Sequence, residues 1–306
     1  MILLITKSIS TLNSSLSTLS PERSPLPMID IQELTFTYKG ESKPALREIS
    51  LSVPDGAFVG VIGPAGAGKT TLARAVSGVI PHHYNGDYYG SVKVDGLDTV
   101  DTPLTDLSRL VGMVFQDVDS QIISSVVEDE LLYGLENFGV PHAEIPARMD
   151  FALNKVGIAD LRERSIASLS GGQRQKVAIA SVIALRPKVL VLDEPTGELD
   201  PLSSRQVFSL LKSLNQEYGV TVVIVEQKIM LLCEFADYLA VLDQGKIVRQ
   251  GKTRDVLARS DELEALGVNC PRVTLLSRLL AEKTGKALPV SVNLDEAEKL
   301  VRGLLL

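Results

Sequence analysis

The sequence predicts an α/β protein with a mostly parallel sheet covered by helices, and three observations lead to this prediction. Short apolar runs typical of buried strands alternate along the chain with segments of helical spacing. One run, 58–62, leads directly into a glycine-rich phosphate-binding motif, and another, 189–192, ends in Asp193 and Glu194. Because the site of an open parallel sheet lies at the carboxyl ends of its strands, we expect both features at one edge.

Length, composition and charge narrow the class of protein. The chain has 306 residues, of which 45% are hydrophobic and 23% charged, and its net charge is −7. This length fits one large α/β domain with an appendage, or two modest domains. No apolar stretch reaches the roughly 18 residues that a membrane-spanning helix needs. The acidic balance disfavours a nucleic-acid-coating surface, so we expect no nucleic acid partner.

Cysteine and histidine usage indicates no disulfide framework and no zinc site. Cys233 and Cys270 stand alone and form no C-x-x-C pair, which fits a reducing cytoplasm. The three histidines, His82, His83 and His142, are interpreted as ordinary surface residues.

Residues 1–27 are expected to form a disordered N-terminal tail. The apolar run 1–5 is shorter than the roughly 7 residues of a signal-peptide core, and the rest is rich in Ser, Thr and Pro. Met28 stands directly before the first strand-like segment, so the sequence leaves Met28 open as an alternative start.

The main domain is expected to span 28–258, and its first half reads as strands around one helix. Segment 29–38 alternates like a half-buried strand, and 45–53 is a second strand before a Pro-Asp-Gly turn. The phosphate motif joins strand 58–62 to a helix over 69–76, and 81–90 reads as a loop. The next strands are 91–96 and 110–115.

The second half reads as helices followed by more strands. Residues 126–138 and 143–156 have helical spacing with no strand between them, which predicts a helical insert at about 117–168. A helix then begins after Ser170 and ends near 185, and strand 189–192 follows it. A second helix, 204–215, leads to strand 220–225. Short Leu-rich helices interrupted at Pro271 and Pro289 predict a C-terminal extension over 259–306.

The phosphate motif is the sequence's clearest chemical signal. Backbone N–H groups converge where strand, glycine-rich turn and helix meet, and such a nest binds anions. We expect the glycines to let the backbone approach the phosphates, Lys69 to neutralise the β and γ phosphates, and Thr70 to ligate Mg²⁺. A chance glycine-rich turn is the alternative, which the flanking strand and helix disfavour. The motif comprises Gly63, Pro64, Ala65, Gly66, Ala67, Gly68, Lys69 and Thr70.

Four further residues complete the expected nucleotide site. Asp193 would hold Mg²⁺, and Glu194 would orient and deprotonate the attacking water. Gln116, which ends its own strand, could reach Mg²⁺ and that water, and Tyr38 could stack on adenine. Each has a plainer explanation in isolation: a solvated strand end for the carboxylates, an ordinary polar residue for Gln116 and a core position for Tyr38.

Together these residues resemble the ATP-binding cassette of ABC transporters, over about 29–257. The resemblance implies a P-loop NTPase fold of the ABC type, with a mostly parallel core, an antiparallel β subdomain and a helical subdomain. It identifies 169–173 as the signature motif, which contacts ATP held by a partner cassette and whose helix N-terminus suits a phosphate. Segment 197–200 matches the loop that crosses the interface between two cassettes.

The resemblance also assigns roles residue by residue. The implied catalytic residues are Glu194, Gln227 and Gln116, and the implied Mg²⁺ site is Thr70, Gln116 and Asp193. The implied ATP-binding residues are Tyr38, Gly63, Pro64, Ala65, Gly66, Ala67, Gly68, Lys69, Thr70, Thr71, Ser170, Gly171, Gly172 and Gln173.

Two further stretches are similar to energy-coupling factor (ECF) transporter ATPases. One is 114–137, which contains Gln116, Asp119 and Gln121, and the other is the tail 270–276. This similarity implies an ATP-hydrolysing motor that powers import of a vitamin or a metal ion. It implies three partners: a second ABC ATPase subunit, identical or not, a membrane scaffold component and a substrate-binding membrane component. The implied location is peripheral, on the cytoplasmic face of the cell membrane.

One position departs from the family pattern. The family has a histidine after the last core strand, where it contacts the γ phosphate, and this chain has Gln227. Glutamine can donate a hydrogen bond but cannot become a cation. Two alternatives therefore stay open: an ATP-binding, weakly hydrolysing cassette of an asymmetric dimer, and a soluble ABC ATPase outside transport. The intact Glu194 argues against a subunit that binds ATP without hydrolysing it.

Overall fold

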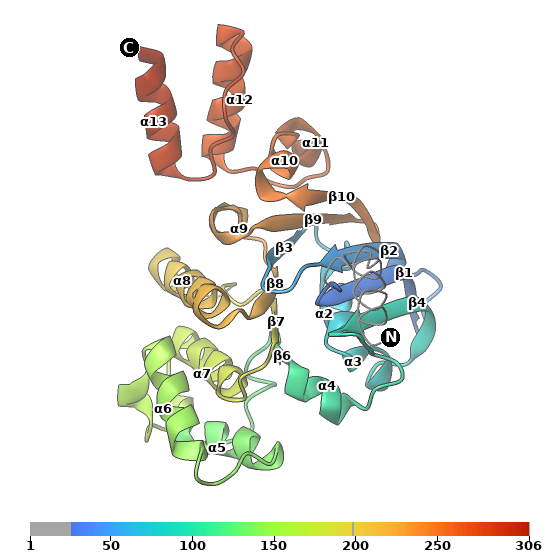
Figure 1. Cartoon of the computed structure of the whole chain (residues 1–306), viewed down its shortest axis with the longest axis vertical. Coiled ribbons are helices and arrows are strands. Elements are labelled where there is room, and N and C mark those ends of the chain that lie inside the picture. Colours follow the sequence, from blue (N-terminus) through green and yellow to red (C-terminus); the bar gives the residue numbers. More distant parts are fainter. Residues whose placement is uncertain (1–25, 198, 306) are drawn as a thin grey trace, which may run out of the picture.

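The computed structural model describes residues 26–197 and 199–305, which contain two sheets with helices around them (Figure 1). The smaller sheet is antiparallel, in the order β2-β1-β4-β5, and the larger has the order β10-β9-β3-β8-β7-β6. The smaller sheet consists of β1 (Ile29–Tyr38), β2 (Leu46–Val53), β4 (Gly86–Val94) and β5 (Leu97–Asp98). The larger consists of β3 (Phe58–Ile62), β6 (Val111–Val114), β7 (Val189–Asp193), β8 (Thr221–Val225), β9 (Tyr238–Asp243) and β10 (Lys246–Lys252).

The larger sheet is parallel except for β10, which pairs antiparallel with β9. Every residue of β3, β7 and β8 is buried, which explains why these segments read as continuous apolar runs. Alternate residues of β7 face opposite layers: Val191 packs toward α2 (Lys69–Val76) and the antiparallel sheet, and Leu190 toward the other helices. The predicted mostly parallel core with a separate antiparallel sheet is confirmed.

A helical arm is attached beside β6 and β7 (Figure 1). It contains α5 (Val127–Asn137), α6 (Ile145–Val156) and α7 (Gly171–Ala184), with α5 and α6 both packed on α7. The two expected helices of the insert are therefore present. Helices α8 (Pro201–Tyr218) and α9 (Ile229–Phe235) cover the core sheet on the same side as α7, since residues of all three belong to one buried cluster. Among the described helices, none is both long and apolar enough to cross a membrane.

Several elements differ from the sequence expectation. Residues 86–90, expected in a loop, begin β4, because Gly86 and Tyr88 pair with Tyr38 and Phe36 of β1. The two paired segments are far apart in the sequence, and the glycine-containing residues 86–90 do not by themselves indicate a strand. Helices α3 (Val79–His82) and α4 (Leu104–Leu110) and strands β9 and β10 were also not predicted. Helix α8 is longer than expected at both ends, and its N-terminus is capped by Asp200.

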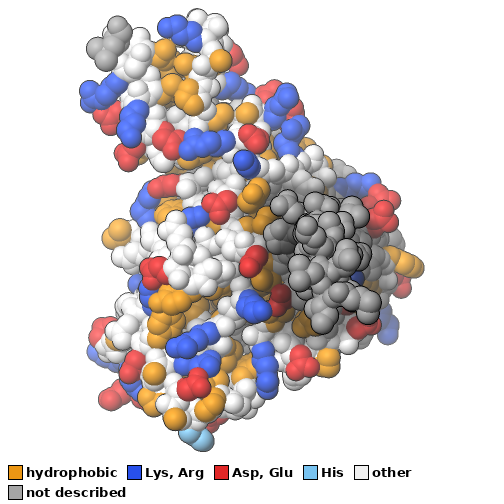
Figure 2. All heavy atoms as spheres, viewed as in Figure 1, with side chains coloured by type: hydrophobic (Ala, Val, Ile, Leu, Met, Phe, Trp, Pro, Cys, Tyr) orange, Lys and Arg blue, Asp and Glu red, His pale blue; other side chains and the backbone are white. Residues whose placement is uncertain are grey.

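The C-terminal part is helical, and some of its residues, such as Leu263 and Val268, belong to the same buried cluster as the core sheet. It contains α10 (Thr253–Leu257), α11 (Ser260–Ala265), α12 (Arg272–Thr284) and α13 (Leu294–Leu305), and the last two lie side by side (Figure 1). Figure 2 shows hydrophobic side chains exposed on this pair, where Leu276 and Leu279 are accessible. Arg254 of α10 donates to Glu296 of α13 at 2.8 and 2.9 Å, which ties the pair to the rest of the chain. That 259–306 form a separate extension stays a prediction, and the expected tail falls mostly on residues 1–25, outside the described part.

Candidate functional site

The phosphate motif forms the turn between β3 and α2. Strand β3 is fully buried between β9 and β8, so its carboxyl end is fixed where the turn begins. Helix α2 starts at Lys69 with Gly68 as its N-cap, and no side chain caps its free N–H groups. A helix N-terminus with uncapped N–H groups attracts an anion. The local geometry therefore suits a phosphate.

The Lys69 side chain lies inside this turn. Its Nζ atom donates to the carbonyl oxygens of Gly63 and Pro64, both at 2.9 Å, and the residue is only 6% exposed. Burial lowers the pKa of the Lys69 ammonium, and the charges of Glu194 and Asp193 oppose this change. A cation held so close to the uncapped N–H groups adds to the attraction for a polyanion.

Packing within the protein also requires glycine at two positions of the turn. A Cβ atom on Gly63 would come within 2.0 Å of the Leu242 carbonyl oxygen, and one on Gly68 within 2.5 Å of the Ala45 oxygen. Both have a positive φ, so packing and backbone conformation alone demand glycine there. Around Gly66 a Cβ atom would meet nothing within 4 Å, so that position leaves room for a ligand.

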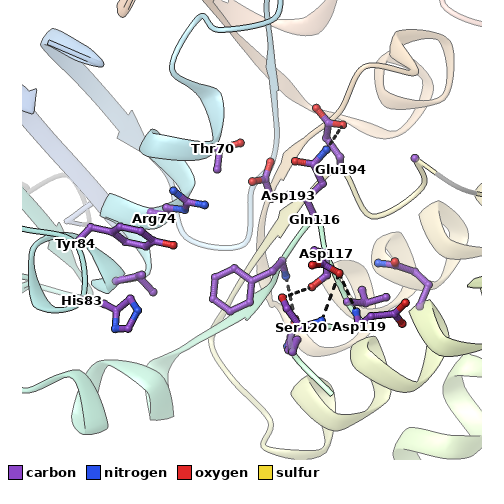
Figure 3. Close-up of a pocket in the computed structure, with 16 residues that line it drawn as sticks. Thr70, Arg74, His83, Tyr84, Gln116, Asp117, Asp119, Ser120, Asp193 and Glu194 are labelled. Carbon is purple, nitrogen blue, oxygen red and sulfur yellow. Dashed lines mark hydrogen bonds between the residues drawn. The ribbon is translucent and has the colours of Figure 1, made fainter. Parts of the chain in front are cut away.

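One cleft brings together residues from both halves of the core, as Figure 3 shows. Thr70 of α2, Gln116 after β6, and Asp193 and Glu194 at the end of β7 all line it. The structure therefore unites four of the predicted residues that are up to 124 positions apart, since 194 − 70 = 124. Residues 115–121, which include Gln116, line the side of the cleft that faces α2 (Figure 3).

Asp193 has the features of a cation ligand. The residue is 1% exposed, and its Oδ1 atom is buried with no hydrogen-bond partner. Burial raises the pKa of the Asp193 carboxyl, the Thr70 side chain opposes this by hydrogen bonding, and nearby Glu194 raises it further. A buried carboxylate oxygen without a partner is costly unless a cation or donor meets it. The hydroxyl and carboxylate oxygens present here fit Mg²⁺, which prefers oxygen ligands.

Glu194 lies between two glutamine amides. Gln227 Nε2 donates to Glu194 Oε1 at 2.7 Å, and Gln116 Nε2 donates to Glu194 Oε2 at 3.2 Å. Its backbone has a φ of 50°, an uncommon left-handed conformation for a residue with a side chain. The Glu194 N–H donates to the Val225 carbonyl, which holds the residue after β7 beside the carboxyl end of β8. Both carboxylate oxygens are thus oriented by neutral donors at the rim of the cleft.

The signature residues lie in a second hollow. Ser170 is the N-cap of α7, and it forms a reciprocal capping box with Gln173. Ser170, Gly171, Gly172 and Gln173 line this hollow together with Leu199 and Asp200. Among the described residues, none lines both this hollow and the cleft of Thr70 and Asp193. The structure therefore does not bring the two predicted phosphate receptors into one site within the described chain.

Tyr38 is placed differently from a free stacking platform. Its ring packs edge-on against Phe36 and Tyr84, with centroids 4.9 and 5.9 Å apart. Its hydroxyl lies 3.2 Å from the Thr71 hydroxyl and accepts a hydrogen bond from Arg74 at 3.3 Å. The described side chains that line the cleft include Tyr84 and do not include Tyr38. Stacking of Tyr38 on adenine stays a prediction.

Sequence reasoning missed several residues of the cleft. Arg74, His83 and Tyr84 line it, and the Arg74 guanidinium lies 4.5 Å from the centre of the Tyr84 ring (Figure 3). Arg74 stands one helical turn after Thr70, a spacing that could have revealed it. The sequence also did not reveal the ion pair between Arg174 Nε and Asp119 Oδ1, which are 2.6 Å apart. This pair joins the segment after Gln116 to the first turns of α7.

Comparisons with known proteins agree with this geometry. A family model described as ABC transporter matches residues 46–197. An ABC transporter ATP-binding protein of Pyrococcus abyssi is 42% identical over 244 residues, which cover 80% of this chain and 87% of that protein. A Pyrococcus horikoshii protein of the same description is also 42% identical, with 80% and 86% covered.

Solved structures with the same fold include cbiO1 and the ATP-binding cassette MJ0796. The structure of cbiO1 from Clostridium perfringens, described as part of the ABC transporter complex cbiONQ, has a TM-score of 0.69 and 30% identity. The match covers 81% of this chain and 97% of that one. A dimeric cassette, MJ0796, in a post-hydrolysis state bound to ADP and Pi, has a TM-score of 0.66 and 28% identity, with 74% and 99% covered.

Proposed function

We propose that this chain, which belongs to the ABC transporter ATP-binding family and is an ATPase, is the motor subunit of an energy-coupling factor importer. The observation that carries the subgroup assignment is the likeness to cbiO1, which extends over 97% of that chain. The two ECF-like stretches, 114–137 and 270–276, support the same assignment. ATP hydrolysis in this subunit would then power the uptake of a vitamin or a metal ion by membrane partners.

The proposed mechanism begins with the phosphates. The N–H groups of 65–70 would bind the β and γ phosphates, and Lys69 would neutralise part of their charge. Thr70, Asp193 and Gln116 would hold Mg²⁺. When bound, Mg²⁺ would supply positive charge against the charge that develops on the phosphate oxygens. The buried Asp193 oxygen without a partner is the observation that supports a cation here.

Glu194 would act on the attacking water. Its carboxylate would accept the water proton, while the Gln116 and Gln227 amides keep its oxygens oriented toward the cleft. Gln227 would also donate to the γ phosphate. Because glutamine stays neutral, this contact would be weaker than that of a protonated histidine.

A second cassette, identical or related, would complete each site. The cleft of Thr70 and Asp193 and the hollow with Ser170 share none of the described residues, so one chain would offer half of each of two sites. Two cassettes packed head to tail would place the signature helix of one over the ATP of the other. We propose that segment 197–200, of which Glu198 lies outside the described residues, crosses between them.

The remaining partners would be in the membrane. We propose a scaffold component that this subunit grips on the cytoplasmic face, and a separate component that binds the substrate. The support is the likeness to cbiO1, which is described as part of a complex. Co-purification of the chain with integral membrane proteins from detergent-solubilised membranes tests this location. Recovery of the chain without any membrane partner would contradict it.

A weakly hydrolysing cassette in an asymmetric dimer is a second candidate. The observation that favours this candidate is the contact of the Gln227 amide with Glu194. The Gln227 side chain is neutral, so it would not place a positive charge beside the γ phosphate. Turnover with the partner cassette's site inactivated separates the candidates: a motor subunit still hydrolyses ATP, and the weak cassette does so barely.

The variant Glu194→Gln tests the proposed function most simply. It keeps the groups that bind ATP but lacks the carboxylate that would accept the proton, so it should bind ATP, stop turning over and accumulate as a pair of cassettes. Size-exclusion chromatography with ATP measures this. Absence of any shift to a larger species would contradict the pairing of cassettes.

A further inference from the structure

The side chain of Lys228 bridges the segment after β8 and the turn after β7. We propose that Lys228 is a positioning residue that fixes the turn after β7, at Thr196 and Leu199, for contact with a second cassette and links it to Gln227. This inference rests on the proposed pairing of cassettes, and it assigns a role to a residue that none of the sequence motifs includes.

The ammonium group of Lys228 is fully used by this turn. Its Nζ atom donates to the carbonyl oxygens of Thr196 and Leu199, the latter at 2.7 Å, and to the Ser204 hydroxyl at 3.3 Å. An ammonium has three donors, so these contacts account for all of them. Ser204 is buried at the first turn of α8, where it also donates weakly toward the Leu199 carbonyl. One side chain thus fixes both ends of the turn and the start of α8.

A second set of bonds ties the same two segments. Glu226 is 2% exposed, and its carboxylate accepts from the Thr196 hydroxyl at 2.7 Å and from the N–H groups of Gln227 and Lys228 at 3.0 and 3.2 Å. Gln227 reaches Glu194 from this segment. A shift of Gln227 toward or away from a phosphate would therefore move the Lys228 backbone, and with it the carbonyls that Lys228 holds.

The surface next to the turn has the character of an interface. Leu202, at the N-terminal end of α8, is 68% exposed, and Met230, at the N-terminal end of α9, is 61% exposed. These two helices pack together and are joined by the ion pair of Arg205 and Glu234. Large apolar side chains that are exposed close together are typical of surfaces that another protein covers. A second cassette is the partner that fits this surface, because Leu199 and Asp200 also line the hollow that contains Ser170.

The test compares two lysines in the Glu194→Gln background. Lys228→Met removes the three hydrogen bonds and keeps the length of the side chain. Lys212→Met is the matched control. Lys212 is also half-buried, and its Nζ atom donates to Asp237 Oδ1 at 2.9 Å. It lines neither the cleft of Thr70 and Asp193 nor the hollow of Ser170. Light scattering on the full chain with ATP gives the protein concentration at half-association, and calorimetry gives the ATP affinity of the monomer.

We expect Lys228→Met to raise the concentration at half-association about tenfold, because the turn loses charge-assisted bonds. The ATP affinity of the monomer and the association of Lys212→Met should match the parent. Lys228→Arg, which keeps a cation with a different donor geometry, should fall between Lys228→Met and the parent, and it serves as the test variant should the Met protein not fold.

Three outcomes would overturn the proposal. Association of Lys228→Met, or of Lys228→Arg where that variant is used, at the parent's concentration would show that Lys228 does not position the interface. An equal loss of ATP affinity in the monomer would place its effect in the chain's own site. A Glu194→Gln parent that never associates with ATP would overturn the pairing of two copies itself, and the role of Lys228 with it.

Discussion

Replacing Gln227 probes the position where this chain departs from the histidine of its family. The Gln227 amide donates to Glu194 Oε1 at 2.7 Å, and Gln116 donates to the other oxygen at 3.2 Å. In Gln227→Ala the first donor is lost, so the carboxylate that would accept the water proton is oriented from one side only. In Gln227→His an imidazole that can be protonated takes the place of the neutral amide.

The size of the effect follows from this contact. The hydrogen bond lies at an exposed rim, so we take about 1 kcal/mol for it, the net value of an ordinary hydrogen bond. If that energy is felt only in the transition state, the rate changes about fivefold. Gln227→Ala should therefore hydrolyse ATP about fivefold more slowly and Gln227→His about fivefold faster, since a charge-assisted bond is stronger than a neutral one.

Single-turnover hydrolysis with the partner cassette's site inactivated measures both changes, because it isolates the chemical step at this chain's own site. ATP affinity measured on the same proteins controls for altered binding. Equal rates for the native, His and Ala proteins would show that the side chain at 227 does not act on the reacting phosphate, and would refute the reasoning.

Two further predictions concern stability. Gly63→Ala should lower the free energy of unfolding by about 3 kcal/mol, because its Cβ atom would meet the Leu242 carbonyl, whereas Gly66→Ala should cost about 1 kcal/mol. Denaturant titration checks both, and equal losses would contradict the packing role of Gly63. Arg254 lowers the pKa of Glu296 below its usual 4.5, so their contact should stabilise the chain above that pH and fade as the pH falls through the lowered value. Thermal unfolding of Arg254→Met should lose this part of the acid dependence, and an unchanged profile would count against it.

The sequence was most informative where local and buried features coincide. The predicted bounds of β3 and α2 match the structure, because a fully apolar strand, a glycine turn and a helix start each have a local signal. The apolar runs of β7 and β8 also identified strands, and parallel pairing of these two brings Asp193 level with Val225. The chemistry-bearing carboxylates could therefore be placed at the sheet edge from the sequence.

The rest depended on contacts between distant segments. Residues 86–90 become a strand only because β1 offers a partner, and the ring of Tyr38 is oriented by Phe36 and Tyr84. The contact of Gln227 with Glu194 joins side chains 33 positions apart, and it depends on the neighbouring places of β7 and β8. Likewise, no periodicity or motif in the sequence predicts the hydrogen bonds of Lys228 to the turn after β7.

The central claim is that one chain carries halves of two different ATP sites, and equilibrium binding of ATP to the monomeric chain tests it most directly. Lys69→Ala should abolish binding, because the phosphate charge loses its buried cation. Ser170→Arg should leave the affinity unchanged, because Ser170 lines a hollow that shares none of the described residues with the cleft of Thr70 and Asp193. Loss of ATP binding by the monomer in Ser170→Arg, to the same degree as in Lys69→Ala, would contradict the account.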